Sequence, residues 1–308
     1  MKIVYLGTPD FSVEPLKRIL QLEGHEVVAV VCNNDKPFGR KKILTAPPVK
    51  VFAKENGIRV LQYDKIRKEG VEDLKSINPD IMITCAFGQI LSQEILDIPK
   101  FGVINIHASL LPYYRGASPI HYALLNGEKK TGITIMKTDV GIDTGDIILQ
   151  KELEIFPNEN CGSLFSRLSI LGAECVVDAL NLIEEGKATF TPQDNKLATF
   201  TKIIEKKDAL IEWNDSADKI FNQVRAFNPS PIAFTLLNGE PFKIYECEIS
   251  EREGNVGEVI FVDKNTLCVG CGNNSINLKI VQKSGGKTVN IKDFLLGNKL
   301  DVGFKFGV

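Results

Sequence analysis

The sequence predicts an α/β protein in which a Rossmann-like open, mostly parallel sheet is followed by a small OB-like β-barrel. Two observations lead to this prediction. In the first part of the chain, short apolar runs alternate with stretches whose apolar residues recur at helical spacing. From Asp208 onward, short alternating runs separated by Gly- and Asn-containing turns replace that pattern.

The N-terminal strands are expected from apolar runs that are almost unbroken, as in a sheet covered on both faces. These runs occupy residues 3–6, 26–32, 57–61, 80–85 and 102–106, and helical stretches occupy 12–22, 48–56, 71–77 and 160–185. Ligands of such sheets bind at the carboxyl ends of the strands. Residues 7–8, 86–88 and 105–107 follow three of these strands, so we expect them to meet in one cleft. The turn over 7–11 lacks the G-x-G-x-x-G pattern, which argues against a bound dinucleotide.

The chain is expected to have three parts. Residues 1–189 form the catalytic domain, and the polar segment 190–207 has the composition of a linker. Residues 208–308 form the OB-like domain. Its expected elements are a helix over 216–226 and strands over 233–237, 242–249, 257–262, 266–271 and 276–281. Barrels of this type often bind oligonucleotides, so the C-terminal domain is expected to contact nucleic acid.

Composition limits the class of protein. The 308 residues carry a formal net charge of -2, so any basic binding surface must be local. No apolar run has the length of a membrane span, and the first run is too short for a signal peptide. The seven cysteines are scattered and odd in number, which suits a reducing cytoplasm. The lone C-x-x-C at 268–271 lies in a strand-like run, so no metal site is expected.

An amide, an imidazole and a carboxylate are the candidate catalytic groups. Asn105 and His107 end an apolar run, and a Gly-rich turn some thirty residues later contains Asp139, Asp143 and Asp146. An amide that donates to a developing oxyanion, beside an imidazole kept charged by a carboxylate, is suited to acyl or formyl transfer. Aspartates in such turns usually bond the backbone, and spacing alone does not separate the three.

These residues also carry a resemblance to a known family. The N-x-H-x-S-L-L-P pattern of residues 105–112 and the D-V-G-x-D-T-G pattern of residues 139–145 resemble the core motif of 10-formyltetrahydrofolate-dependent formyltransferases. Residues 7–11, 36–51 and 225–231 are similar to segments of methionyl-tRNA formyltransferases. The resemblance therefore covers nearly the whole chain, and its central motif is specific.

The resemblance implies a role for individual residues. Asn105, His107 and Asp143 match the family's catalytic asparagine, histidine and aspartate. Two segments match those that bind the folate co-substrate, 10-formyltetrahydrofolate. The matching residues are Ser109, Leu110, Leu111 and Pro112 in the first segment, and Phe87, Gly88 and Ile90 in the second. No metal is implied.

The second substrate is inferred from basic segments. Arg40, Lys41 and Lys42 lie in a Gly- and Pro-containing stretch that is expected to overhang the cleft. The stretch resembles the inserted loop by which methionyl-tRNA formyltransferases bind the acceptor arm, so initiator methionyl-tRNA is the expected partner. The last part of the chain has six lysines against two aspartates, which suits phosphate contacts. The protein is expected to be a monomer without a membrane partner.

Four other functions remain open at this point. A glycinamide ribonucleotide formyltransferase would share the three catalytic residues but should lack the basic insertion and the C-terminal barrel. An aminosugar formyltransferase or a formyltetrahydrofolate hydrolase can carry a similar C-terminal module, and the basic loop is the feature that favours tRNA. A non-catalytic nucleic-acid-binding protein would explain the lysines but would leave Asn105, His107 and Asp143 without a purpose.

Overall fold

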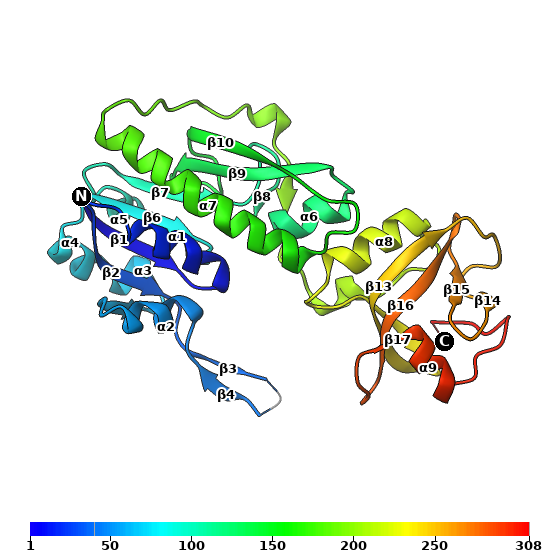
Figure 1. Cartoon of the computed structure of the whole chain (residues 1–308). Coiled ribbons are helices and arrows are strands. Elements are labelled where there is room, and N and C mark those ends of the chain that lie inside the picture. Colours follow the sequence, from blue (N-terminus) through cyan, green and yellow to red (C-terminus); the bar gives the residue numbers. More distant parts are fainter. Residues whose placement is uncertain (40, 308) are drawn as a thin grey trace. The chain divides into compact units, whose positions relative to one another are not determined.

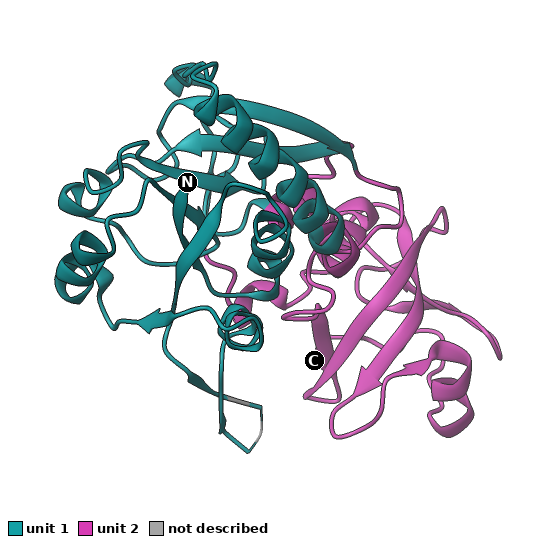
Figure 2. Ribbon diagram, turned by 60° about the vertical axis from the view of Figure 1, so that its left-hand side comes forward, with its two compact units in different colours: residues 1–119, 130–154, 165–202 teal, residues 120–129, 155–164, 203–308 magenta. Residues whose placement is uncertain are grey.

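The computed structural model describes residues 1–39 and 41–307, which form two compact units (Figures 1 and 2). Unit 1 comprises Met1–Pro119, Lys130–Glu154 and Phe165–Lys202. Unit 2 comprises Ile120–Lys129, Ile155–Leu164 and Ile203–Val308. None of the described helices combines the length and the apolar character that a bilayer crossing requires.

Within the described residues, unit 1 is built on a seven-stranded sheet with the order β10-β9-β7-β6-β1-β2-β5. Its strands are β1 (Lys2–Gly7), β2 (Glu26–Cys32), β5 (Val60–Gln62), β6 (Ile81–Cys85), β7 (Val103–His107), β9 (Lys130–Lys137) and β10 (Ile147–Glu154). The five strands from β7 to β5 are parallel, whereas β9 pairs antiparallel with β7, and β10 pairs antiparallel with β9. The predicted mostly parallel α/β sheet is confirmed, and the two antiparallel strands extend it.

Helices cover both faces of this sheet (Figure 1). They are α1 (Val13–Ile19), α2 (Pro48–Glu55), α3 (Ile66–Glu69), α4 (Val71–Ile77), α5 (Gln93–Leu96) and α7 (Cys161–Glu184). On one face, Gly172 of α7 lies against Ile106 of β7. On the other face, residues of α3, α4 and α5 pack in one apolar cluster with Val103. Side chains alternate along a strand, so Asn105 and His107 lie on the same face as Val103.

Two pairs of short strands complete unit 1. β8 (Arg115–Gly116) pairs in parallel with β11 (Phe200–Thr201), and β3 (Lys36–Phe38) pairs with β4 (Ile43–Thr45) in a hairpin. β11 lies inside the segment 190–207 for which the sequence predicts a linker. Residues 199–201, in the middle of that segment, are therefore hydrogen-bonded to the chain that follows β7.

Unit 2 contains an antiparallel sheet with the order β12-β13-β16-β15-β14, and β17 pairs with β16. Its elements are α6 (Pro119–Leu125), α8 (Ala217–Ala226), β12 (Phe234–Leu237), β13 (Glu240–Ser250), β14 (Val259–Val262), β15 (Leu267–Gly270), β16 (Ser275–Lys283), β17 (Val289–Asn290) and α9 (Ile291–Gly297). Phe242 and Phe306 stack with ring centroids 5.7 Å apart in its core. Trp213 donates to the Thr235 hydroxyl at 3.0 Å, which satisfies the buried indole nitrogen. The predicted small β-domain is confirmed.

Candidate active site

The loops that follow β1, β2 and β6 meet at one edge of the unit 1 sheet. Thr8, directly after β1, donates from its hydroxyl to the carbonyl oxygen of Phe87 at 3.3 Å. Asn33, directly after β2, donates to the same oxygen at 3.0 Å. Parallel strands bring their carboxyl ends to a common edge, which explains why these distant segments lie together. β7 ends at the same edge with His107.

The structure brings Asn105, His107 and Asp143 together. Asn105 Nδ2 donates to Asp143 Oδ1 at 3.5 Å, and His107 Nδ1 lies 3.6 Å from Asp143 Oδ2. Only 6% of the His107 side chain and 17% of the Asp143 side chain are exposed. Water therefore screens this pair weakly, and its electrostatic interaction is stronger than that of a surface pair.

The hydrogen bond of Nε2, the second ring nitrogen of His107, shows that Nδ1 is the nitrogen that faces the Asp143 carboxylate. His107 Nε2 lies 3.0 Å from the carbonyl oxygen of Tyr114. A carbonyl oxygen can only accept, so Nε2 carries a proton and donates it. Nδ1 is then the nitrogen directed at Asp143. A doubly protonated ring would meet an acceptor at each end, so the site suits a charged imidazole.

Thr84 orients the amide of Asn105, and the sequence reasoning did not single it out. The hydroxyl of Thr84 donates to Asn105 Oδ1 at 2.9 Å, which leaves the Nδ2 group to face Asp143. The two residues are partners in the parallel pairing of β6 and β7. The contact could have been predicted by aligning the carboxyl ends of the two strands, which places Thr84 beside Asn105.

Asp143 is held in an unusual backbone conformation. Its φ is 54°, in the left-handed region, and its Oδ2 accepts from the backbone N–H of Gly116 at 2.7 Å. Two residues later, any Cβ at Gly145 would overlap the carbonyl oxygen of Lys137. Glycine is therefore required at position 145 for the chain to approach β9 this closely.

Asp139 has a different role in the same loop. Its carboxylate accepts from the backbone N–H of Gly141 at 3.0 Å and from the hydroxyl of Thr144 at 2.7 Å. These bonds are local to the turn, as expected of an aspartate in a Gly-rich segment. The geometry thus distinguishes Asp143, whose carboxylate faces His107, from Asp139, whose carboxylate braces the loop.

The segment Ser109 to Pro112 forms a tight turn after β7. The Ser109 hydroxyl donates to the carbonyl oxygen of Tyr113 at 2.6 Å, and Leu111 is buried. Leu110 packs against the position where Gly132 lacks a side chain. Pro112 follows a cis peptide bond and is half-buried. Of the four predicted folate-binding residues, Ser109 and Leu111 thus have contacts within the protein, and Leu110 and Pro112 are partly exposed.

The second predicted folate segment, Phe87 to Ile90, is a loop after β6 fixed by its neighbours. The Phe87 side chain is buried in the apolar core, and Gly88 has a φ of 79°. Gln89 donates to the side chain of Asn33 at 2.8 Å. Ile90 is 65% exposed, so it is the member of this segment with an apolar surface open to a ligand.

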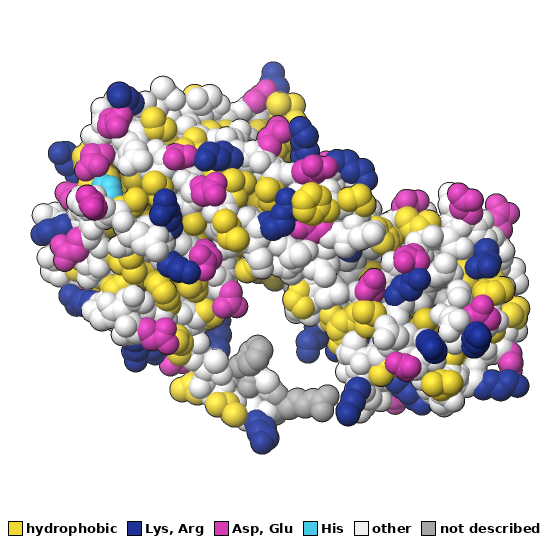
Figure 3. Space-filling model, in the orientation of Figure 1, with side chains coloured by type: hydrophobic (Ala, Val, Ile, Leu, Met, Phe, Trp, Pro, Cys, Tyr) yellow, Lys and Arg dark blue, Asp and Glu magenta, His cyan; other side chains and the backbone are white. Residues whose placement is uncertain are grey.

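The basic stretch forms the β3–β4 hairpin rather than an irregular loop. Lys41 and Lys42 lie at its turn and are exposed, and Arg40 falls outside the described residues. Ile43 and Leu44 are 63% and 66% exposed. Figure 3 shows apolar and basic side chains along this hairpin. It therefore presents both cations and apolar groups to the solvent.

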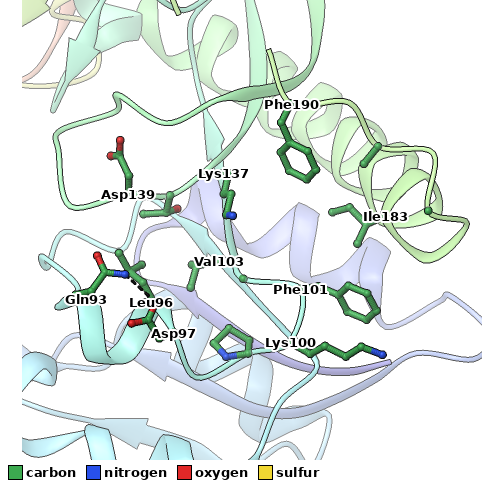
Figure 4. Close-up of a pocket in the computed structure, with 15 residues that line it drawn as sticks. Gln93, Leu96, Asp97, Lys100, Phe101, Val103, Lys137, Asp139, Ile183 and Phe190 are labelled. Atoms are coloured by element: carbon green, nitrogen blue, oxygen red, sulfur yellow. Dashed lines mark hydrogen bonds between the residues drawn. The ribbon is translucent and has the colours of Figure 1, made fainter. Parts of the chain in front are cut away.

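A cavity of about 690 Å³ lies at the opposite, amino end of β7. Figure 4 shows Lys137, Val103 and Asp139 on one side of it and Ile183 and Phe190 on the other. None of the predicted catalytic or folate-binding residues lines this cavity.

All seven cysteines are buried as free thiols. Burial raises the pKa of Cys85 and of Cys161 to about 12, so these thiols stay protonated at neutral pH. Within the described part of the chain, no three His, Cys, Asp or Glu side chains are grouped so that they could hold a metal ion.

Comparison with known proteins identifies the family. The family model "Formyl transferase" matches residues 1–180, and "Formyl transferase, C-terminal domain" matches residues 203–299. A methionyl-tRNA formyltransferase of Geobacter metallireducens is 43% identical over 308 residues, which is 100% of this chain and 99% of that protein. The chain belongs to the methionyl-tRNA formyltransferase family. A further member, from Ruminiclostridium cellulolyticum, is 45% identical over 312 residues and is matched from end to end.

The fold of unit 1 and unit 2 recurs in solved structures. An N-formyltransferase from Helicobacter canadensis matches with a TM-score of 0.69 at 21% identity, covering 92% of this chain and 99% of that one. At this sequence identity, the match shows that the two proteins share a fold. The family and the enzymatic class predicted from the sequence are confirmed, and the hypothesis of a non-catalytic nucleic-acid-binding protein is wrong.

Proposed function

We propose that this protein transfers the formyl group of 10-formyltetrahydrofolate to the amino group of methionine on initiator methionyl-tRNA. One observation carries the proposal. Asn105 and His107 each lie within 3.6 Å of the Asp143 carboxylate in a chain that is 43% identical, over its whole length, to a methionyl-tRNA formyltransferase. The product would be N-formylmethionyl-tRNA, which serves translation initiation.

The three side chains are proposed to stabilise the transition state. The methionine amine attacks the formyl carbon, a new C–N bond forms, and the formyl oxygen gains negative charge. Asn105 Nδ2 and His107 Nδ1 are the side-chain nitrogens that face the Asp143 carboxylate, and both are proposed to donate to that oxygen. The Asp143 carboxylate would keep the imidazole charged. When the tetrahedral intermediate collapses, the proton lost by the attacking amine is passed on to the folate nitrogen, the bond between that nitrogen and the formyl carbon breaks, and tetrahydrofolate leaves.

The formyl donor is proposed to bind beside the loops that follow β6 and β7. Ile90 is largely exposed, and Leu110 and Pro112 are partly exposed, which gives apolar surface for a flat heterocycle. The buried Ser109, Leu111 and Phe87 would shape the loops without touching the ligand. The structure of a HypX protein from Aquifex aeolicus, similar in fold, was determined in complex with tetrahydrofolic acid, which agrees with folate as the ligand class.

The tRNA is proposed to contact the β3–β4 hairpin and the C-terminal domain of residues 208–308. Lys41 and Lys42 are exposed at the turn of the hairpin. Of the six C-terminal lysines, Lys279 is paired with Glu248 at 2.7 Å, and Lys299 lies 3.6 Å from Asp301. The basic surface of that domain is therefore weaker than the residue count suggests, and the remaining lysines are the better candidates for phosphate contacts. These are Lys283, Lys287, Lys292 and Lys305.

We further propose the domain limits 1–189 and 208–308, joined by residues 190–207, and a monomeric enzyme of the cytoplasm. The buried free cysteines suit a reducing compartment. Sedimentation of the purified protein would give its mass directly, and a dimer would contradict the monomer.

The function is tested by the acceptor dependence of tetrahydrofolate release. Purified protein is given the formyl donor together with charged initiator tRNA, uncharged tRNA, a nucleotide-linked aminosugar, or no acceptor. We expect release only with the charged tRNA. Release without any acceptor would make the protein a hydrolase, and release with the aminosugar alone would contradict tRNA as the substrate.

Replacing Arg40, Lys41 and Lys42 by glutamine should raise the KM for charged tRNA and flatten its salt dependence. Each phosphate contact that is lost should reduce the slope of log affinity against log salt by about 0.7 to 0.9. Lys65 and Lys68, which are exposed elsewhere in unit 1, give a matched control when changed to glutamine. A similar change in tRNA KM in the control, or an equal loss of folate affinity in the hairpin variant, would contradict a specific tRNA contact.

A further inference from the structure

Both the nitrogen and the oxygen of the Gln193 side-chain amide are hydrogen-bonded within the protein. Its Nε2 donates to the carbonyl oxygens of Asp143 and Gly145 at 2.9 and 2.7 Å. Its Oε1 accepts from Nε and Nη2 of Arg115 at 3.0 and 2.8 Å. Carbonyl oxygens only accept and a guanidinium only donates, so the amide fits in one orientation and not when flipped. Gln193 therefore links Arg115 to the loop that carries Asp143.

Arg115 is a fixed anchor for this link. The residue is 2% exposed, and its Nη2 also donates to Asn195 Oδ1 at 2.9 Å. Its backbone N–H donates to the carbonyl oxygen of Thr199 at 2.9 Å, next to the pairing of β8 with β11. A buried guanidinium with this many bonds cannot move without leaving donors unsatisfied. The glutamine that is bound to it is held equally firmly.

The loop after β9 depends on such outside support. Val140 and Ile142, its two apolar side chains, are 66% and 65% exposed, so apolar packing does not hold them. The carboxylate of Asp139 braces the loop from within, but it makes no bond to residue 143. Asp143 has a left-handed φ of 54°, a conformation that aspartate tolerates better than most residues but that is still uncommon. The bonds from Gln193 to the carbonyl oxygens of residues 143 and 145 hold the backbone directly after this left-handed residue.

We propose that Gln193 is a positioning residue for Asp143. It fixes the backbone on both sides of Thr144, and so sets the distance of the Asp143 carboxylate from His107 and from Asn105. The inference rests on the proposed function, in which that carboxylate keeps the imidazole charged. A small displacement of a catalytic group lowers the rate without altering the affinity for substrates whose binding contacts lie elsewhere.

Gln193→Glu is the most specific test, because it keeps the contact with Arg115 and removes the contact with the loop that carries Asp143. The carboxylate still accepts from Arg115, and more strongly than the amide does, but it cannot donate to the carbonyl oxygens of Asp143 and Gly145. Asn195→Ala is the matched control, since it removes the other acceptor of Arg115 and leaves the loop contacts intact. Gln193→Ala repeats the loss of donors without adding a charge.

We expect Gln193→Glu and Gln193→Ala to lower kcat on the order of tenfold or more, with both KM values within about twofold of the wild type. Asn195→Ala should keep near-normal turnover. In an Asp143→Asn background, Gln193→Glu should have little further effect, because both changes act on the same carboxylate. Full additivity of the two changes would overturn the proposal, as would wild-type turnover in both Gln193 variants.

Hydrogen exchange gives a readout that does not need activity. The Gly116 amide, which donates to Asp143 Oδ2, should exchange faster in Gln193→Glu, while amides of the central strand β1 keep their protection. Unchanged exchange at Gly116 would overturn the positioning role. Loss of protection throughout unit 1 would also overturn it, since the residue would then support the fold in general. If the wild type itself shows no formyl transfer, the proposed function fails, and this exchange result still reports on the link.

Discussion

Replacing His107 by alanine is expected to lower kcat by about a hundredfold or more, while the affinity for the formyl donor changes little. The imidazole matters most when negative charge develops on the formyl oxygen, because Nδ1, the ring nitrogen that faces Asp143, is the proposed donor to that oxygen. The same loss is expected for Asn105→Ala, which removes the amide that Thr84 aims at the site. Single-turnover rates at saturating substrates would measure both effects.

His25→Ala is the control for the histidine substitution. His25 precedes β2, so it lies at the amino end of a parallel strand, away from the edge where His107 lies. Its replacement should leave kcat unchanged. Near-normal turnover in His107→Ala or in Asn105→Ala would show that the oxyanion is stabilised elsewhere.

Asp143→Asn is expected to lower kcat on the order of tenfold to a hundredfold. The substitution keeps the size of the side chain, tolerates the left-handed backbone, and leaves an oxygen that can accept from the Gly116 N–H. What it removes is the negative charge 3.6 Å from His107 Nδ1. The rate loss would therefore measure the stabilisation of a charged imidazole.

The same substitution four residues earlier is the matched control. Asn at position 139 keeps an acceptor for Gly141 and Thr144, and Asp139 makes its bonds within the turn. Asp139→Asn should therefore be close to wild type in kcat. If it were as slow as Asp143→Asn, the charge would act through the whole loop, and the direct pairing with His107 would lose its support.

The parallel part of the sheet could be predicted because its signal is local. The runs that become β1, β2 and β6 are apolar except at Lys2, Glu26 and Thr84, as expected of strands covered on both faces. β10 alternates half-buried and exposed residues from Leu149 to Glu154, and β9 precedes it across the loop of Asp139 to Gly145. The antiparallel pairing of β9 with the distant strand β7 places both strands in the sheet, and short apolar runs do not predict such long-range pairing.

The site could be predicted only in part for a similar reason. Asn105 and His107 lie at the end of a strand, and the apolar pattern of the sequence predicts that strand. Asp143, in contrast, could be distinguished from Asp139 and Asp146 only by the family resemblance and then by its geometry. Thr84 and Gln193 contact the site from 21 and 50 residues away along the chain. The polar composition around Gln193 suits a linker equally well, because composition shows what a residue can bond but not which partner it meets.

The burial of all the cysteines has a practical consequence for spectroscopy. Maleimide reagents attack the thiolate, and burial keeps thiols such as Cys85 and Cys161 protonated as well as inaccessible. A cysteine placed at Lys41, at the exposed turn of the β3–β4 hairpin, should therefore react alone in the folded protein. A single adduct in the mass spectrum would verify this. A fluorophore could then report on tRNA binding without removing any native cysteine.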